Sequence, residues 1–131
     1  MANFNEHLKK GAIAGGASCA VYCIVYYLKE KKKNPELNFD FSKLLCYVLI
    51  AAVTGAAAGI LPDKLEPANN PNHRKFFHSV TFYVILTWLI LKIVNKKDME
   101  PIGKSLAASG LISYGSHILI DSTTAKSIPI I

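Results

Sequence analysis

Four long uncharged stretches constrain what this chain can fold into more than any other feature. They cover residues 11–28, 44–61, 76–91 and 105–120. A helix needs about 20 apolar residues to cross the hydrocarbon core of a bilayer, with a lower limit of about 17. The first two stretches meet this requirement and the other two come close to it. Lys92 and Lys104 could lengthen the last two, because a lysine at a helix end reaches out to the interface.

The pattern inside these stretches separates a membrane protein from a soluble helical bundle. Helices of small soluble bundles carry a polar face at a spacing of 3.6 residues, whereas residues 44–61 (LLCYVLIAAVTGAAAGIL) are apolar on all sides. The chain of 131 residues is 51% hydrophobic, which is high for a soluble domain. We therefore expect one all-α domain over residues 1–131, an integral membrane bundle of four short transmembrane helices.

Small residues in the first two stretches would let their helices approach closely without a hydrophobic driving force. They are Gly11, Gly15, Ala51, Gly55 and Gly59. The same small faces would also permit a homo-oligomer.

The surplus of positive charge has two readings. The chain carries 15 Lys and Arg against 9 Asp and Glu, and such a balance is common in proteins that bind nucleic acid. Here the lysines flank the apolar stretches, as membrane topology requires. We therefore expect the lipid bilayer as the partner of this chain, and no nucleic acid.

Four crossings would distribute the connecting segments over two faces. Residues 29–43 and 92–104 share one face and carry nine lysines, whereas the N-terminus, residues 62–75 and the C-terminus share the other face with six Lys and Arg. Lys and Arg are biased toward the cytoplasm. The count thus predicts a multi-pass protein of the cell membrane with both termini on the extracytoplasmic side.

The extracytoplasmic face would also gather every histidine of the chain and several acids. His7 comes just before the first helix, His73 and His78 at the start of the third, and Asp63 and Glu66 at the end of the second. His117 and Asp121 lie toward the end of the fourth helix. Ionisable groups at membrane helices are costly and by default mark function. We predict that these distant residues form one site at a single membrane rim.

The sequence HILID favours a metal ion in this site. His117 and Asp121 are four residues apart and therefore share one helix face. Imidazole and carboxylate ligands without cysteine suit Zn, with Mn or Fe also compatible. The predicted ligands of this divalent ion are His7, Asp63, His78, His117 and Asp121.

The chain contains no nucleophile elbow, Walker loop, GxGxxG or HExxH motif. A metal-activated water is therefore the simplest mechanism, with a carboxylate or histidine accepting the proton. Asp63 and Glu66 are candidates for this base, or for further ligands, beside His73. Arg74 could bind an anionic group such as phosphate, or pair with Glu66. The membrane-edge position suggests an ester or phosphoester of a lipid-like molecule as substrate.

Four short motifs in a fixed order make the chain similar to a known family. His7 and Gly11 form HxxxG, and LPD (61–63), HRKFFHS (73–79) and SHILIDSTTAKSIPII (116–131) follow. The combination resembles the YdjM-like family of LexA-binding, inner-membrane-associated proteins that are predicted to be metal-dependent hydrolases. The resemblance implies a bacterial inner-membrane protein, or a phage-encoded equivalent. It also implies metal-binding or catalytic roles for the residues that match the motifs: Asp63, His73, Arg74, His78, His117 and Asp121.

One motif departs from the family, and two other function classes stay open. Many members read LPDxDHP where this chain has LPDKLEP, so Leu65 and Glu66 replace an Asp and a His. The number of ions and their identity are therefore open. A non-enzymatic protein with a structural metal site or a regulatory role is the main alternative. A small channel or transporter ranks lower, because few polar residues besides Thr54, Thr87 and Ser113 occur in the helix middles.

Overall fold

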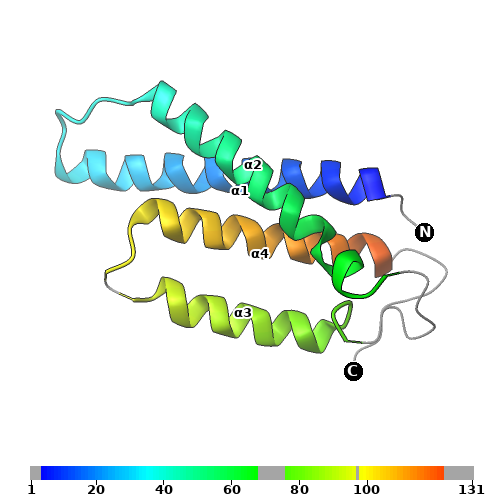
Figure 1. Ribbon diagram of the computed structural model, residues 1–131. Helices are drawn as coiled ribbons and strands as arrows, with labels where there is room; N and C mark the ends of the chain where they lie inside the picture. The colour runs from blue at the N-terminus through cyan, green and yellow to red at the C-terminus, as the bar shows by residue number, and fades with distance from the viewer. Residues whose placement is uncertain (1–3, 68–75, 97, 123–131) are drawn as a thin grey trace.

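The computed structural model describes residues 4–67, 76–96 and 98–122. Within these residues the chain forms four helices and no strand, so the predicted all-α class is confirmed. In chain order the helices are α1 (Phe4–Lys33), α2 (Phe41–Leu65), α3 (Val80–Val94) and α4 (Pro101–Ser122), as Figure 1 shows.

Local signals in the sequence set several helix ends. Asp40 caps the N-terminus of α2, because its side chain accepts a hydrogen bond from the amide of Lys43. Ser79 caps α3 in the same way and accepts from the amide of Phe82. Pro101 is the first residue of α4, a position where its missing N–H costs nothing.

Two predicted boundaries are wrong. His7 lies inside α1 and not before it, because the helix already begins at Phe4. An uncharged stretch marks only the apolar part of a helix, and Glu6 and Lys10 extend it with an ion pair of i,i+4 spacing. The third helix begins at Val80, since the Ser79 cap leaves residues 76–79 as a turn. His78 therefore precedes α3.

Three helices pack against one another and the fourth lies outside them. Helices α1, α2 and α4 are in mutual contact, whereas within the described residues α3 packs on α4 alone. Glycines form the α1–α2 contact, as expected. A Cβ atom on Gly55 would lie 2.5 Å from the carbonyl oxygen of Gly11, and one on Gly59 would lie 2.9 Å from that of His7. The two backbones therefore touch directly.

The distribution of polar residues is the reverse of that in a soluble protein. One face of α4 is fully buried and carries a polar residue at every fourth position: Ser105, Ser109, Ser113, His117 and Asp121. Meanwhile large apolar side chains point outward, including Val53 at 71% exposure, Ile13 at 70% and Leu119 at 68%. A soluble helical bundle is not compatible with this pattern, which apolar surroundings would stabilise.

The serines also correct the prediction that the helix middles hold almost no polar groups. Ser105 donates to the sulfur of Cys19, Ser18 and Ser109 are 3.1 Å apart, and Ser113 donates to the carbonyl of Gly11. Small hydroxyls of this kind join helices in membrane proteins. They belong to the close packing of α1 and α4, and each is bonded to a fixed partner.

Two helices, α1 and α2, are long and apolar enough to cross a membrane, and α3 is a shorter apolar helix. At 1.5 Å per residue, the 15 residues of α3 span about 22 Å, less than the hydrocarbon core. Lys92 lies over the ring of Trp88, 3.9 Å from its centroid. Lys92 lies in the last turn of α3, and a lysine at a helix end is typical of an interface.

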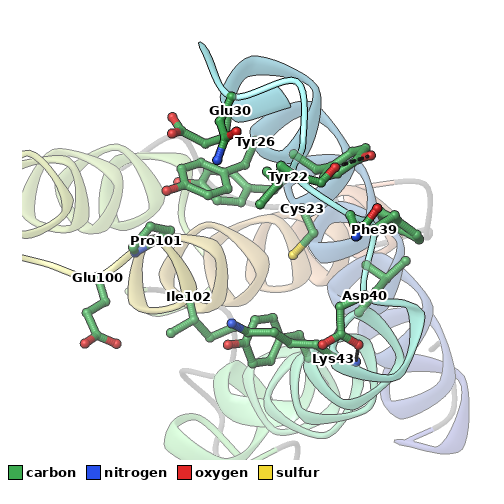
Figure 2. Close-up of a pocket in the computed structure, with 16 residues that line it drawn as sticks. Tyr22, Cys23, Tyr26, Glu30, Phe39, Asp40, Lys43, Glu100, Pro101 and Ile102 are labelled. Atoms are coloured by element: carbon green, nitrogen blue, oxygen red, sulfur yellow. Dashed lines mark hydrogen bonds between the residues drawn. The ribbon is translucent and has the colours of Figure 1, made fainter. Parts of the chain in front are cut away.

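The end of the bundle with the loop between α1 and α2 contains a cavity of about 610 Å³ (Figure 2). Its walls come from α1, this loop, the first turns of α2 and the start of α4. Five aromatic rings and three carboxylates are among the lining side chains: Tyr22, Tyr26, Tyr27, Phe39, Tyr47, Glu30, Asp40 and Glu100. No histidine lines it.

Candidate metal centre

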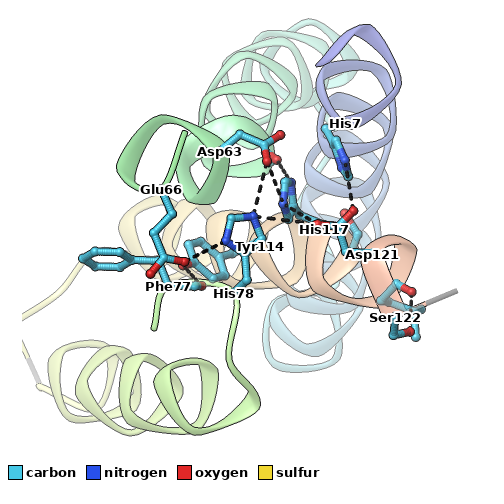
Figure 3. Close-up of polar contacts among 12 residues, drawn as sticks. His7, Asp63, Glu66, Phe77, His78, Tyr114, His117, Asp121 and Ser122 are labelled. Carbon is cyan, nitrogen blue, oxygen red and sulfur yellow. Dashed lines mark hydrogen bonds and ion pairs between the residues drawn. The ribbon is translucent and has the colours of Figure 1, made fainter. Parts of the chain in front are cut away.

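At the end of the bundle away from the cavity, residues from α1, α2 and α4 meet a residue from the turn before α3. This is the end at which α1 begins (Figure 1). His7 comes from the second turn of α1, Asp63 from the last turn of α2 and His78 from the turn before α3. His117 and Asp121 lie on the buried face at the end of α4. Figure 3 shows these side chains pointing toward one another. The alternation of the helices thus brings together residues more than one hundred positions apart.

Four of these residues form a group that could hold a metal ion: Asp63, His78, His117 and Asp121. One ligand atom from each lies within 4.8 Å of all the others. His78, His117 and Asp121 are fully buried. Two carboxylates in so enclosed a place are costly without a positive charge to balance them. A bound cation would supply that charge.

The distances between the ligand atoms fit a small ion. Asp63 Oδ1 lies 3.3 Å from His78 Nε2 and 3.6 Å from His117 Nε2. Asp121 Oδ2 lies 3.7 Å and 3.5 Å from the same two nitrogens. Ligands bonded to a tetrahedral ion at about 2.1 Å stand about 3.4 Å apart, against about 3.0 Å for neighbours around a six-coordinate ion. The four separations therefore match a tetrahedral site better than an octahedral one.

Glu66 fixes the orientation of His78. Its carboxylate accepts from His78 Nδ1 at 3.0 Å and from the amide of Phe76 at 2.8 Å. A carboxylate only accepts hydrogen bonds, so Nδ1 carries a proton. When the ring is neutral, Nε2 presents its lone pair to the centre. Such a partner behind a ligating histidine raises metal affinity.

The pKa values of this pair reflect the same contacts. Burial by itself would raise the pKa of the Glu66 carboxyl, but hydrogen bonds from His78 and from the amides of residues 76–78 lower it below its usual value. Burial would lower the pKa of His78, whereas Asp63, Glu66 and then Asp121 raise it above its usual value. The carboxylates thus hold a proton on His78 when no other cation is near. A metal ion at Nε2 would replace that proton.

His117 is oriented by the backbone of α2. Its Nδ1 lies 2.6 Å from the carbonyl oxygen of Gly59, which accepts the hydrogen bond. Nε2 is then left to face Asp63 and Asp121, and it is buried without a hydrogen-bond partner among the described residues. Both histidines of the group therefore turn Nε2 toward the same point.

Tyr114 was not among the predicted site residues, and it supports the turn that carries His78. Its hydroxyl donates to the carbonyl of Phe77 at 2.6 Å, and its side chain is buried. Ser79 closes the same turn by donating to the carbonyl of Phe76. Tyr114 lies three residues before His117 and hence on the same helix face, which is the only signal that could have identified it.

The other predicted site residues have different positions. His7 stacks on His117 with ring centroids 3.9 Å apart, and its Nε2 lies 3.5 Å from Asp121 Oδ1. Glu66 lies behind His78 and outside the four-ligand group. Asp63 is the most exposed member of the group, with 27% of its side chain accessible. His73 and Arg74 lie outside the described residues.

Comparison with known protein families gives one match. Residues 12–131 match the family described as YdjM inner membrane protein. The chain belongs to this YdjM family. Comparisons with curated proteins and with solved structures give no match. Membership confirms the resemblance, and the matched residues contain three of the four motifs, whereas His7 and Gly11 precede them. Together with the apolar helices α1 and α2, it identifies a membrane protein with a YdjM-family His/Asp group that could hold a metal ion.

Proposed function

We propose that this YdjM-family protein is a membrane-bound, metal-dependent hydrolase of an ester or phosphoester in a lipid-like substrate. The observation that carries the proposal is the convergence of Asp63, His78, His117 and Asp121 on one buried point. Zn is the metal we favour, because imidazole and carboxylate ligands at tetrahedral spacing suit it. A divalent ion held there would supply an acidified water as nucleophile.

In this proposal all four helices cross the bilayer, and the centre lies at the extracytoplasmic rim. The outward-facing apolar side chains of α1, α2 and α4 support four crossings, and the larger number of lysines on the loops at the other end supports the orientation. Helix α3 is short for a crossing, and Lys92 in its last turn would extend it to the interface, with its amine over the ring of Trp88.

The side chains of the centre differ in what they can do for the reaction. Asp63 is partly exposed, so substrate would approach from its side, and its carboxylate is placed to accept a proton there. Glu66 and the Gly59 carbonyl would hold His78 and His117 in position. The exposed apolar residues Phe4, Leu61 and Leu65 lie near the same end of the bundle. They would accommodate the acyl chains of a lipid-like substrate.

Metal content and hydrolysis measured on the same samples test the proposal. We expect the purified chain to retain a divalent ion and to cleave a panel of lipid phosphoesters. The variants His117→Ala and Asp121→Ala would lose both properties while keeping their helical content. Lys10→Gln, on the exposed face of α1, serves as the control and would keep both. Normal metal content in both centre variants would contradict the proposal.

A structural metal site is the second candidate, because one observation favours it. Structural zinc is bound by four protein ligands, whereas a catalytic ion keeps a position open for water, and the group offers four ligands. The two candidates differ in the response to Asp63→Ala. A catalytic centre would keep much of its metal and lose turnover, whereas a structural site would lose thermal stability along with its metal.

A further inference from the structure

The two carboxylate oxygens of Asp121 have different neighbours. Oδ2 is the oxygen that faces His78 and His117 within the four-ligand group. Oδ1 faces His7, whose Nε2 lies 3.5 Å away. Figure 3 shows this contact on the α1 side of the centre, away from Glu66. Asp121 therefore links the four-ligand group to an imidazole that is not part of it.

His7 is buried but is not held by the hydrogen bonds that hold the other two rings. Only 2% of the residue is exposed, and Nδ1 has no hydrogen-bond partner among the described residues. The 3.5 Å between Nε2 and Asp121 Oδ1 exceeds the usual length of an N–H···O hydrogen bond, about 2.7–3.2 Å. This distance of 3.5 Å is close to the spacing of about 3.4 Å expected for two ligands of one tetrahedral ion.

We propose that His7 Nε2 and Asp121 Oδ1 bind a second divalent ion, more weakly than the four-ligand group binds the first, and that a phosphoryl group completes its coordination. This inference rests on the proposed metal-dependent function. It assigns the positions that bind substrate oxygens to the second ion. It also narrows the substrate class to phosphoesters.

Coordination number supports this division of roles. The first ion would have four protein ligands, so a fifth position is left for the water of the proposed reaction and little room remains for substrate oxygens. The second ion would have two ligands from the described residues, His7 and Asp121, so that substrate oxygens and water fill its other positions. A carboxylate that bridges two ions places them at the separation of about 3.5–4 Å found in two-metal hydrolytic sites.

Charge balance identifies the class of ligand. The charges of Asp63 and Asp121 together neutralise one divalent ion, and Glu66 behind His78 adds one negative charge. A second ion would still leave an excess of positive charge in a buried place, which is unfavourable unless an anion accompanies it. A phosphoryl anion can supply the balance, whereas a neutral carboxylic ester cannot. Binding of the second ion and of phosphate should therefore strengthen each other by the same factor.

The experiment measures ion stoichiometry in the full chain purified in detergent. Equilibrium dialysis against micromolar Mn²⁺ is followed by metal analysis, with and without inorganic phosphate, and electron paramagnetic resonance reports whether two ions are coupled. We expect one ion per chain without phosphate, and two coupled ions with it. Phosphate should tighten the second site at least about tenfold, equivalent to about 1.4 kcal/mol.

The variant His7→Phe provides the decisive comparison, because phenylalanine keeps the stacking on His117 and cannot bind a metal. It should hold one ion whether or not phosphate is present, and the retained ion shows that the centre is folded. Lys10→Gln, one turn away on α1, should hold two ions with phosphate.

Three results would overturn the inference: a single ion in the unaltered chain with phosphate present, two ions in His7→Phe, or loss of both ions from His7→Phe. A single ion in the unaltered chain would leave the proposed hydrolase centre intact. Absence of any bound ion would overturn the proposed function as well.

Discussion

At the end of the bundle where α1 begins, three imidazoles and the carboxylate of Asp121 are buried against one another, beside the partly exposed carboxylate of Asp63. At the other end, aromatic and acidic side chains line an open cavity of about 610 Å³. This cavity and the reactive groups therefore lie at opposite ends of the molecule.

The size of the side chains along α1 explains this difference. The buried residues of α1 are His7, Gly11, Gly15, Gly16 and Cys19, and glycine lets α2 come into backbone contact. Beyond Cys19, three of the five α1 residues that line the cavity are tyrosines, which need more space. Figure 1 shows α2 crossing α1 and then diverging from it toward the loop between them. The small residues of α1 thus bring α1 and α2 together at the polar end, and the larger residues hold them apart at the aromatic end.

The aromatic cavity is readily explained without catalysis. Tyrosines are enriched where membrane helices leave the hydrocarbon region, and the lysine-rich loops lie at this end. Tyr27 illustrates the local role of these rings, since its hydroxyl accepts from Lys31 and its ring packs edge-on against Phe39. We therefore expect the two ends to respond differently to the same kind of change.

Metal removal should have the largest effect. An ion present at about one thousand times its dissociation constant stabilises the folded state by about 4 kcal/mol. Extracting it with a chelator should lower the thermal midpoint and restoring it should recover the loss. Amide exchange should rise around residues 59–66 and 114–122 and stay unchanged at residues 34–43. Equal increases at both ends would remove the distinction between them.

Gly55→Ala should destabilise the chain by about 3 kcal/mol, since the added methyl group meets two fixed neighbours. The nearest atoms are the carbonyl oxygen of Gly11 at 2.5 Å and Ser113 Oγ at 2.7 Å. The control Gly110→Ala meets no heavy atom within 4 Å and should be neutral or stabilising by about 0.5–1 kcal/mol. Thermal unfolding of both variants in detergent provides the measurement. Similar midpoints would show that the close α1–α2 contact is not what holds the polar end together.

The glycines illustrate how much of this fold the sequence predicts. The uncharged stretches identified four helices, and the small residues identified the faces that meet. Helix alternation was sufficient to place Asp63, His78 and the pair His117 and Asp121 at one end. The helix boundaries at His7 and His78 were wrong, because caps and charged turns, and not hydrophobicity, decide where a helix begins.

The hydrogen bonds that orient the ligands could not be predicted. The partner of His117 is the backbone carbonyl of Gly59. Every residue has such a carbonyl, so the residue types in the sequence do not identify this partner. Glu66 was a candidate base or ligand from its charge alone. Its bonds to His78 and to the amide of Phe76 depend on how the turn before α3 folds back on α2.

Glu66→Gln tests this orienting role at the polar end. Glutamine has one accepting oxygen where glutamate has two, so it cannot accept from both the Phe76 amide and His78 Nδ1 as the carboxylate does, and the imidazole would lose the charged partner that fixes its tautomer. Metal affinity should fall about 10- to 100-fold, measured by competition with a chelating dye. Glu30→Gln makes the same change at the cavity end, where Glu30 pairs only with Lys33 in the described contacts. It should leave the affinity unchanged, and an equal loss in both variants would contradict a specific role for Glu66.

Tyr27→Phe should have the smallest effect. It removes the hydroxyl that accepts from Lys31 at 2.9 Å and donates to the carbonyl of Leu37 at 3.4 Å. Partly exposed hydrogen bonds of this kind contribute about 1 kcal/mol or less. Stability should drop slightly, with metal content and hydrolysis unchanged. A loss of hydrolysis in this variant would mean that the cavity end takes part in the reaction.

X-ray absorption spectroscopy of the metal in the purified chain tests the central claim most directly, because it reports the atoms bonded to the ion. We predict nitrogen and oxygen ligands at about 2.0–2.2 Å, with the outer scattering of imidazole rings. A spectrum with sulfur ligands, or one without imidazole, would contradict a metal centre built from Asp63, His78, His117 and Asp121.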